Sequence, residues 1–485
     1  MNCPKRYLVF IISYLLITLN LPLMIGAQEI PPLKTYMPAQ NEVEKHKKIL
    51  DDPTPWVKTW NDKDLCPPEV YALLVSDPDE MKTLWAELVG LKAPDVVGKI
   101  EPEIKPGKYT YKDVQDNPAF KNLMYPDLYA RIKPGGPPFA GNIPEFEIIP
   151  TRQYYWALKI AQTTKNNEGK TKLDAEGYVE HTTWKGGFPF PKPSGPFKAQ
   201  QIVYNALVFR RDRGEGNGLS YGHVLGFDKK LKMDMDNKYN AAAMMVAGRS
   251  FLPPYGWYDE QAEKRGQLSF QTLNMLTPRD IAGMAMLFNY YLDAKKTDAS
   301  MVYIPSLRRV RKMSATDTQD PIAGQDLIND DQSGFMQKLS PTRYPYKIEL
   351  VEEREYLVAA PTLDGAEYVT SDGLEFRGLK FERRPIYVVK MTQLDTNYVY
   401  SKRIFYIDKE TFQFYQVENY DQKGRLYRTF WAYYQFKPDQ GMFTWGGYLL
   451  YRDHVDLHSN VVFSVDLSGV NSRQDIVSRL TKGRK

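Results

Sequence analysis

Cysteine is almost absent from this chain of 485 residues, which contains only Cys3 and Cys66. Cys3 precedes an apolar N-terminal stretch, so it cannot be the acylated cysteine that follows a bacterial lipoprotein signal. If this stretch is removed on export, one cysteine remains and no internal disulfide can form. The core must then be stabilised by burial alone.

Long apolar runs are also absent, except at the N-terminus. Lys5 and Arg6 precede a mostly apolar stretch over residues 8–25, and two small residues follow it. This order predicts a secretory signal peptide over residues 1–27. An uncleaved membrane anchor remains the alternative, although a polar residue and a proline interrupt the stretch. No later segment has the run of a transmembrane helix, so the mature protein is expected to be water-soluble or peripheral.

An excess of charge of one sign is absent as well. The chain has 64 Lys and Arg against 59 Asp and Glu, which gives a net charge of +5. A general polyanion binder would carry a larger positive excess. We therefore expect no nucleic acid as a partner.

Motifs of catalysis and of nucleotide binding are missing too: there is no G-x-S-x-G elbow and no Walker loop. Gly214, Gly216 and Gly218 follow an arginine-rich stretch and open no helix, so they do not predict a phosphate site. If "RDHVDLH" is a strand, His454 and His458 lie about 13 Å apart, too far to chelate one metal ion, whereas a helix would bring them together. We expect no catalytic residue, no metal and no cofactor, and hence a protein that is not an enzyme.

Strand patterns dominate the chain from residue 151 onward. Residues 28–150 are rich in proline and aromatic residues, and they are expected to form an irregular extension with one helix at "PDEMKTLWAELVGLK". Turn signals within residues 402–436 predict a three-stranded antiparallel meander. Residues 277–294 fit a helix or a strand. The predicted fold class is mainly β (α+β), a curved antiparallel sheet with packed helices.

The third strand of the predicted meander carries large aromatic side chains on both faces. Phe430 and Trp431 represent the two faces, since neighbouring residues of a strand point to opposite sides. One face then covers a core and the other lines something else. The alternative is a sheet that protein covers on both sides.

Three segments of the chain carry a resemblance to known proteins. They are residues 186–195, 302–331 and 402–428, which read "GGFPFPKPSG", "VYIPSLRRVRKMSATDTQDPIAGQDLINDD" and "KRIFYIDKETFQFYQVENYDQKGRLYR". In this order and spacing they resemble the domain of unknown function 1329 family of exported Gram-negative proteins. The second and third also resemble outer-membrane lipoprotein-sorting (Lol-type) carriers, whose fold is an incomplete β-barrel around a hydrophobic cavity.

This resemblance implies a lipoprotein-carrier-like half-barrel domain over residues 151–485 and a strand over residues 281–292. It also implies a location in the periplasm or at the outer membrane, peripheral contact with that membrane, and an RND-type transporter as partner. Ser306 stands where the family commonly has glycine, so the conformation of that turn stays open.

The first segment predicts a rigid connector, because its prolines fix φ and remove backbone donors while two glycines allow a turn. Its candidate structural or binding residues are Gly186, Gly187, Phe188, Pro189, Phe190 and Pro191. Both phenylalanines are expected in apolar surroundings.

The second segment places four cations in five positions behind a predicted strand. Its candidate residues are Tyr303, Pro305, Arg308, Arg309, Arg311, Asp326, Asp330 and Asp331. On a strand that begins at Arg308, Arg309 and Arg311 share one face. We expect them to pair with the aspartates as a latch that holds the following loop against the sheet. The alternative is a basic rim that meets lipid headgroups or an acidic partner protein.

The function predicted from these features is non-catalytic binding of a lipid or other hydrophobic molecule. Burying about fifteen methylenes at roughly 0.8 kcal/mol each represents on the order of 12 kcal/mol, which requires a deep apolar cavity. A half-closed sheet with aromatic residues on both faces can form such a cavity. The alternative is a structural or adaptor protein of the cell envelope, whose concave face is plugged by its own segments.

Overall fold

The structure is a computed structural model that describes residues 68–467, except 211–214, 216–217, 314–316, 323–324, 344, 364–369 and 372. The predicted signal peptide, the first part of the extension and Cys66 lie outside the described residues. The predictions made for them stay predictions.

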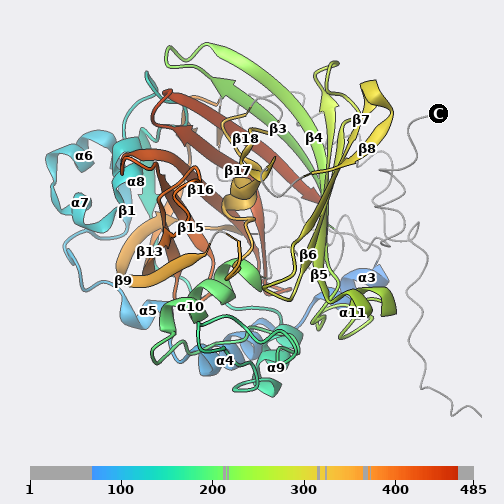
Figure 1. Cartoon of the computed structure of the whole chain (residues 1–485). Coiled ribbons are helices and arrows are strands. Elements are labelled where there is room, and N and C mark those ends of the chain that lie inside the picture. Colours follow the sequence, from blue (N-terminus) through green and yellow to red (C-terminus); the bar gives the residue numbers. More distant parts are fainter. Residues whose placement is uncertain are drawn as a thin grey trace, which may run out of the picture.

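One strongly curved sheet organises the fold (Figure 1). In spatial order its strands are β1 (Gly107–Thr110), β2 (Glu145–Ile148), β13 (Lys380–Gln393), β14 (Lys402–Asp408), β15 (Phe414–Tyr420), β16 (Leu426–Lys437), β17 (Met442–Asp453), β18 (His458–Leu467), β3 (Gly218–Phe227), β4 (Met233–Met245), β5 (Gln267–Thr277), β6 (Ala285–Tyr291), β7 (Ala299–Ile304) and β8 (Arg309–Lys312). The path runs from β1 to β8 without closing on itself.

Three further pairings complete the strand set, one long and two short. β9 (Tyr346–Ala359) pairs with β13, and β10 (Thr362–Leu363) pairs with β16. β11 (Thr370–Ser371) and β12 (Phe376–Arg377) form a separate two-stranded sheet. Neighbours in the large sheet are antiparallel except for β2 with β13 and β10 with β16. The predicted fold class, mainly β with a curved and mainly antiparallel sheet, is therefore confirmed.

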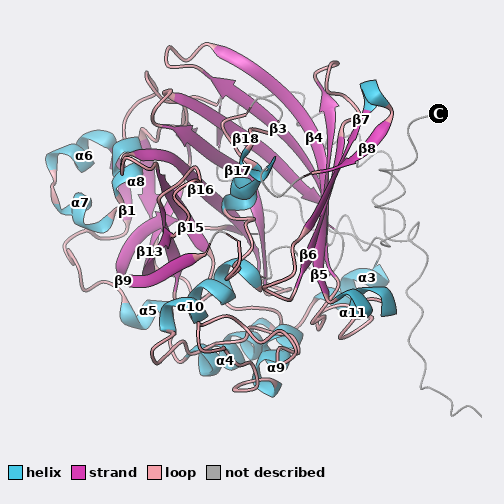
Figure 2. Cartoon of the chain, viewed as in Figure 1, coloured by secondary structure: helices cyan, strands magenta, loops and turns pink. Residues whose placement is uncertain are grey.

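Short helices pack around this sheet (Figure 2). They are α3 (Pro68–Leu74), α4 (Pro78–Val89), α5 (Ala93–Val96), α6 (Tyr111–Asp116), α7 (Ala119–Leu123), α8 (Pro126–Arg131), α9 (Leu158–Asn166), α10 (Lys198–Val203) with the π-helical η2 (Tyr204–Val208), α11 (Glu260–Arg265), and the 3-10 turns η3 (Pro305–Leu307), η4 (Asp317–Gln319) and η5 (Asn329–Gly334).

The helix predicted within residues 78–92 is confirmed as α4, which ends at Val89. The Asp77 carboxylate caps its first turn by accepting from the Asp79 N–H at 2.8 Å, and Gly90 ends it with a left-handed φ of 75°. Met81 and Trp85 lie on its buried face. Four-residue spacing on a helix places both side chains on the core.

The described part of the extension contains short regular elements between its irregular stretches. Residues 107–148 add β1 and β2 to the sheet, and they also contain α6, α7 and α8. α8 covers the outer face of β16, where the Arg131 guanidinium lies 4.3 Å from the ring of Trp431. Helix caps such as the Thr110–Asp113 capping box stabilise these short elements.

A segment of the chain fills the concave side of the sheet. We call the described residues of 317–340 the plug segment; it includes η4 and η5 and connects the edge strand β8 to β9 beside the opposite part of the sheet. In Figure 1 it is the gold stretch inside the curve of the strands. Phe335 packs edge-on against Phe405 of β14 with ring centres 5.8 Å apart. A side chain at Gly334 would lie 2.6 Å from the Phe414 ring, so only glycine fits there.

Protein therefore covers both faces of the third meander strand. Phe430 faces the plug segment and Trp431 faces α8, and each side chain is 1% exposed. Of the two alternatives for these aromatic faces, the structure has the sheet covered on both sides. The meander itself is confirmed as β14, β15 and β16.

Turns in the structure decide the predictions for residues 277–294 and for "RDHVDLH". Residues 285–291 form β6, as the family resemblance implied, after a turn at 278–283. The strand predicted for "RDHVDLH" is wrong, because a hairpin turn at 454–457 joins β17 to β18. The Asp453 carboxylate accepts from two backbone N–H groups of that turn at 2.9 Å, and this local hydrogen bonding competes with the ladder.

Candidate functional site

Carboxylates hold the plug segment against the sheet. Asp331 accepts from Arg403 Nη1 at 2.6 Å and from the Tyr400 hydroxyl. Asp330 accepts from the Tyr398 hydroxyl at 2.8 Å. All five side chains are buried. A buried ion pair needs such additional hydrogen bonds to offset its desolvation, and here tyrosine hydroxyls provide them.

A second ionic contact lies near the start of the plug segment. His458 Nδ1 contacts the Asp326 carboxylate, and its Nε2 lies 3.0 Å from Asp234 Oδ1. The hydrogen bond to Asp326 raises the pKa of His458 to about 9. The imidazole is therefore a cation at neutral pH, and it joins the plug segment to β18 and β4.

The predicted latch between the arginines and the aspartates is wrong. Arg309 and Arg311 are exposed on β8, and within the described part of the chain no carboxylate lies at ion-pair distance from either. Asp331 pairs instead with Arg403, which is 72 positions further along the chain. β8 is the edge of the sheet, while the plug segment runs away from it toward β14, so closeness in sequence does not become contact.

The glycines of the predicted connector occupy positions that only glycine tolerates. Gly186 and Gly187 have φ values of 110° and 70°. A side chain at Gly186 would lie 2.9 Å from the carbonyl oxygen of Gly248, and one at Gly187 would lie 2.7 Å from the Thr164 backbone. Both residues are needed for close backbone approach as well as for the turn.

The phenylalanines of this connector anchor it in the core. Phe188 is buried, and its ring lies 5.2 Å from Trp85 and 5.3 Å from Trp156. Phe190 is half-buried, and Asn205 bonds both its N–H and its C=O. The predicted apolar surroundings are confirmed for Phe188 and hold for part of the Phe190 ring.

Two small pockets lie between the plug segment and the strands β5 to β7. The larger has a volume of about 100 Å³ and the smaller about 50 Å³. The two share one wall, made of Tyr290, Asp298, Met336, Gln337 and Lys338. They are thus two parts of one interrupted space along the plug segment.

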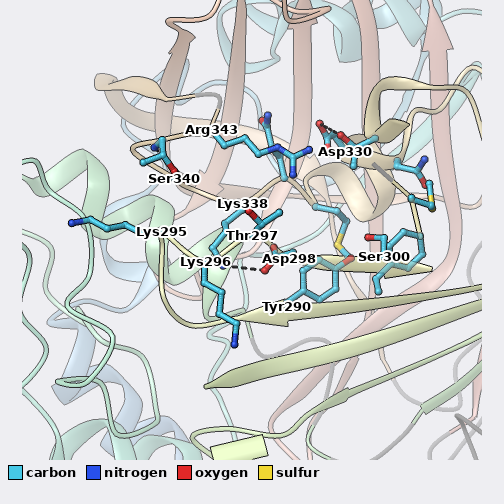
Figure 3. Close-up of a pocket in the computed structure, with 17 residues that line it drawn as sticks. Tyr290, Lys295, Lys296, Thr297, Asp298, Ser300, Asp330, Lys338, Ser340 and Arg343 are labelled. Atoms are coloured by element: carbon cyan, nitrogen blue, oxygen red, sulfur yellow. Dashed lines mark hydrogen bonds and ion pairs between the residues drawn. The ribbon is translucent and has the colours of Figure 1, made fainter. Parts of the chain in front are cut away.

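The larger pocket combines cationic and apolar walls (Figure 3). Its basic side chains are Lys295, Lys296, Lys338 and Arg343, against the two carboxylates Asp298 and Asp330. Phe288, Met313 and Met336 supply apolar surface. The smaller pocket is lined mainly by apolar residues, including Val179, Leu207, Phe209 and Leu339.

An ion pair belongs to the wall that the two pockets share. Lys338 Nζ donates to Asp298 Oδ1 at 2.9 Å and to the Tyr291 carbonyl at 2.6 Å, and the Tyr291 N–H donates to the same carboxylate oxygen. Figure 3 shows Lys338 and Asp298 pointing toward one another. Burial raises the pKa of Asp298, which the Lys338 charge partly offsets. The contact joins the plug segment to the start of β7.

Burial also changes the charge of the larger pocket. It raises the pKa of Asp330 to about 6, although the Tyr398 hydrogen bond lowers it. Asp330 thus carries less than a full negative charge at slightly acidic pH, and the pocket becomes more positive as pH falls.

The candidate residues predicted from the sequence fall in three separate places. Residues 186–191 form the core connector, residues 303–311 form the β7–β8 hairpin, and Asp326, Asp330 and Asp331 belong to the plug segment. Of these, Asp330 lines a pocket. Sequence reasoning missed the ion pair of Lys338 and Asp298, whose partners lie 40 positions apart without a motif around either.

The described linings of both pockets contain no histidine and no cysteine that could activate or act as a nucleophile. Among the described residues, no group of three or more His, Cys, Asp or Glu side chains is placed to hold a metal ion. No helix in the described part of the chain is long and apolar enough to cross a membrane.

Fold and site together define an open, curved β-sheet whose concave face is occupied by a segment of its own chain. The chain belongs to the family described as protein of unknown function (DUF1329), whose model matches residues 139–479. It is 26% identical over 278 residues to the uncharacterized protein PA3922 of Pseudomonas aeruginosa. That match covers 56% of this chain and 57% of the relative, so the chain spans little more than half the length of the curated protein it matches.

Three solved structures are similar to this one at low identity. A proposed outer membrane lipoprotein-sorting protein domain from Vibrio parahaemolyticus is 16% identical with a TM-score of 0.40, covering 58% of this chain and 97% of that one. A DUF1329 family protein from Desulfovibrio piger is 15% identical at 0.36, covering 52% and 84%. A LolA superfamily protein from Nitrosomonas europaea is 15% identical at 0.36, covering 57% and 96%.

Proposed function

We propose that this protein is a non-catalytic binder of a hydrophobic or amphiphilic molecule, which it holds between the plug segment and strands β5 to β7. The observation that carries this proposal is the pair of pockets on either side of Lys338, one with cationic walls and one with apolar walls. An anionic group fits the first and an apolar group fits the second.

With the plug segment in place, the two pockets have room for only part of such a ligand. Pockets for drug-sized ligands measure about 300–1,000 Å³, whereas these measure about 100 and 50 Å³. Binding a long acyl chain therefore requires the plug segment to move away from the sheet. Breaking the contact of Lys338 with Asp298 would join the pockets, because these two residues belong to their common wall.

A structural or adaptor role in the cell envelope is the second candidate. One observation favours it: the plug segment and α8 bury both faces of β16. A carrier would instead leave one face of the sheet free for its ligand. In that role the pockets are packing defects with no ligand. The two functions differ in whether the purified protein retains or takes up an apolar molecule.

The cellular setting is also part of the proposal. Export to the periplasm follows from the predicted signal peptide, and contact with the outer membrane and with an RND-type transporter follows from the family resemblance alone. None of these is needed for the binding site itself. The proposal also includes the division of the chain into an extension over 28–150 and a half-barrel domain over 151–485.

Organic extraction of the purified full chain followed by mass spectrometry tests the proposal first. A matched pair of variants tests the site: Ala294→Trp places a large ring in the smaller pocket, and Ala175→Trp places one in an exposed loop. With 1-anilinonaphthalene-8-sulfonate, an anionic apolar probe, we expect fluorescence to fall in Ala294→Trp and to stay unchanged in Ala175→Trp. An empty extract together with equal probe binding by both variants would favour the adaptor role.

A further inference from the structure

The hairpin that joins β7 to β8 exposes basic and apolar side chains together. We call residues 304–312 the basic hairpin. The 3-10 turn η3 reverses the chain, Arg308 takes a left-handed φ of 49°, and β8 follows as the edge strand. All four residues of β8 are exposed. Leu307 and Val310 are 45% and 54% exposed, so two aliphatic side chains stand among the cations of the basic hairpin.

The cations of the basic hairpin are not neutralised by the described protein. Arg308, Arg309, Arg311 and Lys312 make no ion pair within the part of the chain that the structure describes. The aspartates that follow them are bonded to Arg403, Tyr398 and His458 instead. Four positive charges in five positions therefore face solvent.

Strand alternation directs Arg309 and Arg311, but not Lys312, toward the concave side. Arg309 and Arg311 pair with Ile304 and Val302 of β7, and Met313, two residues further, lines the larger pocket. Residues two apart on a strand share a face. The two arginines thus form a rim that leads to the cationic pocket.

We propose that the basic hairpin docks this protein on an anionic lipid surface, with its arginines on the phosphate groups and Leu307 and Val310 in the interface. Cations that flank exposed aliphatic side chains suit a bilayer boundary, which offers both phosphate and acyl surface. A second copy of the chain is a poorer occupant, since pairing two β8 edges would bring like charges together. In Figure 1 the hairpin lies at the opposite side of the molecule from α6 and α7. This inference does not rest on the proposed ligand.

Vesicle co-sedimentation of the full chain tests the docking. The vesicles are phosphatidylcholine with and without phosphatidylglycerol, at low and high salt. The test variant is Arg309→Ala with Arg311→Ala, and the control is Lys108→Ala with Lys112→Ala, which removes the same charge from exposed positions beside α6. We expect binding to anionic vesicles only, weakened about thirtyfold in the test variant, since each cation near such a surface contributes about a fivefold change. The control should bind like the wild type.

A second variant separates the apolar part of the contact. Leu307→Ser with Val310→Ser should weaken binding and leave its salt dependence unchanged, because the charges remain. Equal binding to neutral vesicles, equal losses in the test and control variants, or no vesicle binding at all would overturn the proposal. Concentration-dependent dimers that the arginine variant abolishes would assign the edge to a second copy and overturn it as well.

Discussion

Replacing Asp331 by alanine tests whether the plug segment is held by its buried ion pair. The substitution removes the carboxylate 2.6 Å from Arg403 Nη1 and leaves that guanidinium, which is 0% exposed, without its anionic partner. Stranding a buried charge costs about 3–5 kcal/mol. The Tyr400 hydroxyl loses its acceptor as well, at about 1 kcal/mol. We expect the free energy of unfolding, measured by urea denaturation, to fall by about 4–6 kcal/mol.

Two comparisons make this measurement specific. Arg425→Ala breaks the exposed ion pair with Asp421 and should cost under about 1 kcal/mol. Replacing both buried partners, as Asp331→Leu with Arg403→Met, should recover most of the loss, because no buried charge is then left alone. Hydrogen exchange should show faster exchange of the plug segment in the single variant. A loss below about 1 kcal/mol in Asp331→Ala would mean that Arg403 reaches water, and the buried-pair reasoning would be refuted.

Three further predictions follow from single positions. Gly187→Ala should lower the melting temperature more than Gly195→Ala does. Both glycines have φ near 70°, but a side chain at Gly187 would collide with the Thr164 backbone, whereas one at Gly195 meets nothing within 4 Å. Equal losses would mean that the close approach at Gly187 does not contribute to stability. The ion pair of His458 with Asp326 should add its full stabilisation below the unfolded pKa of histidine, near 6.5, and this stabilisation should be lost as the pH rises through the folded pKa of about 9. The measurement is the free energy of unfolding as a function of pH in the wild type and in His458→Gln. Identical pH dependence in the two proteins would contradict the prediction. N-terminal sequencing of exported protein should begin at or near Gln28, whereas an intact N-terminus recovered from membranes would favour the anchor.

Local sequence patterns predicted the elements whose stability is local. The helix at 78–89 has its own cap, its own apolar face and a terminal glycine, and the meander at 402–436 has turn residues between strands of steady alternation. The surrounding tyrosine- and leucine-rich pattern predicts a strand through residues 452–458, where the structure has a hairpin turn at 454–457. The Asp453 side chain ends the strand there by bonding the turn backbone, which alternation does not report.

The candidate site depended on contacts that sequence spacing does not contain. The basic cluster is followed within about twenty residues by five aspartates, and this closeness in sequence predicts local ion pairs. In the structure, Asp331 pairs instead with Arg403, on a strand far along the chain. In the wall shared by the pockets, Lys338 of the plug segment pairs with Asp298, which is 40 positions away in the sequence. Such pairs come from the curvature of the whole sheet, so neither composition nor periodicity could identify them.

The plug segment is tethered at both ends, because it is the connection from β8 to β9. A tethered segment competes with any incoming ligand at a fixed effective concentration that dilution cannot reduce. The apparent affinity for that ligand equals the intrinsic affinity multiplied by the fraction of molecules whose plug is withdrawn. Substitutions that only loosen the plug, far from any ligand atom, would therefore tighten binding, while those that hold it in place would favour release.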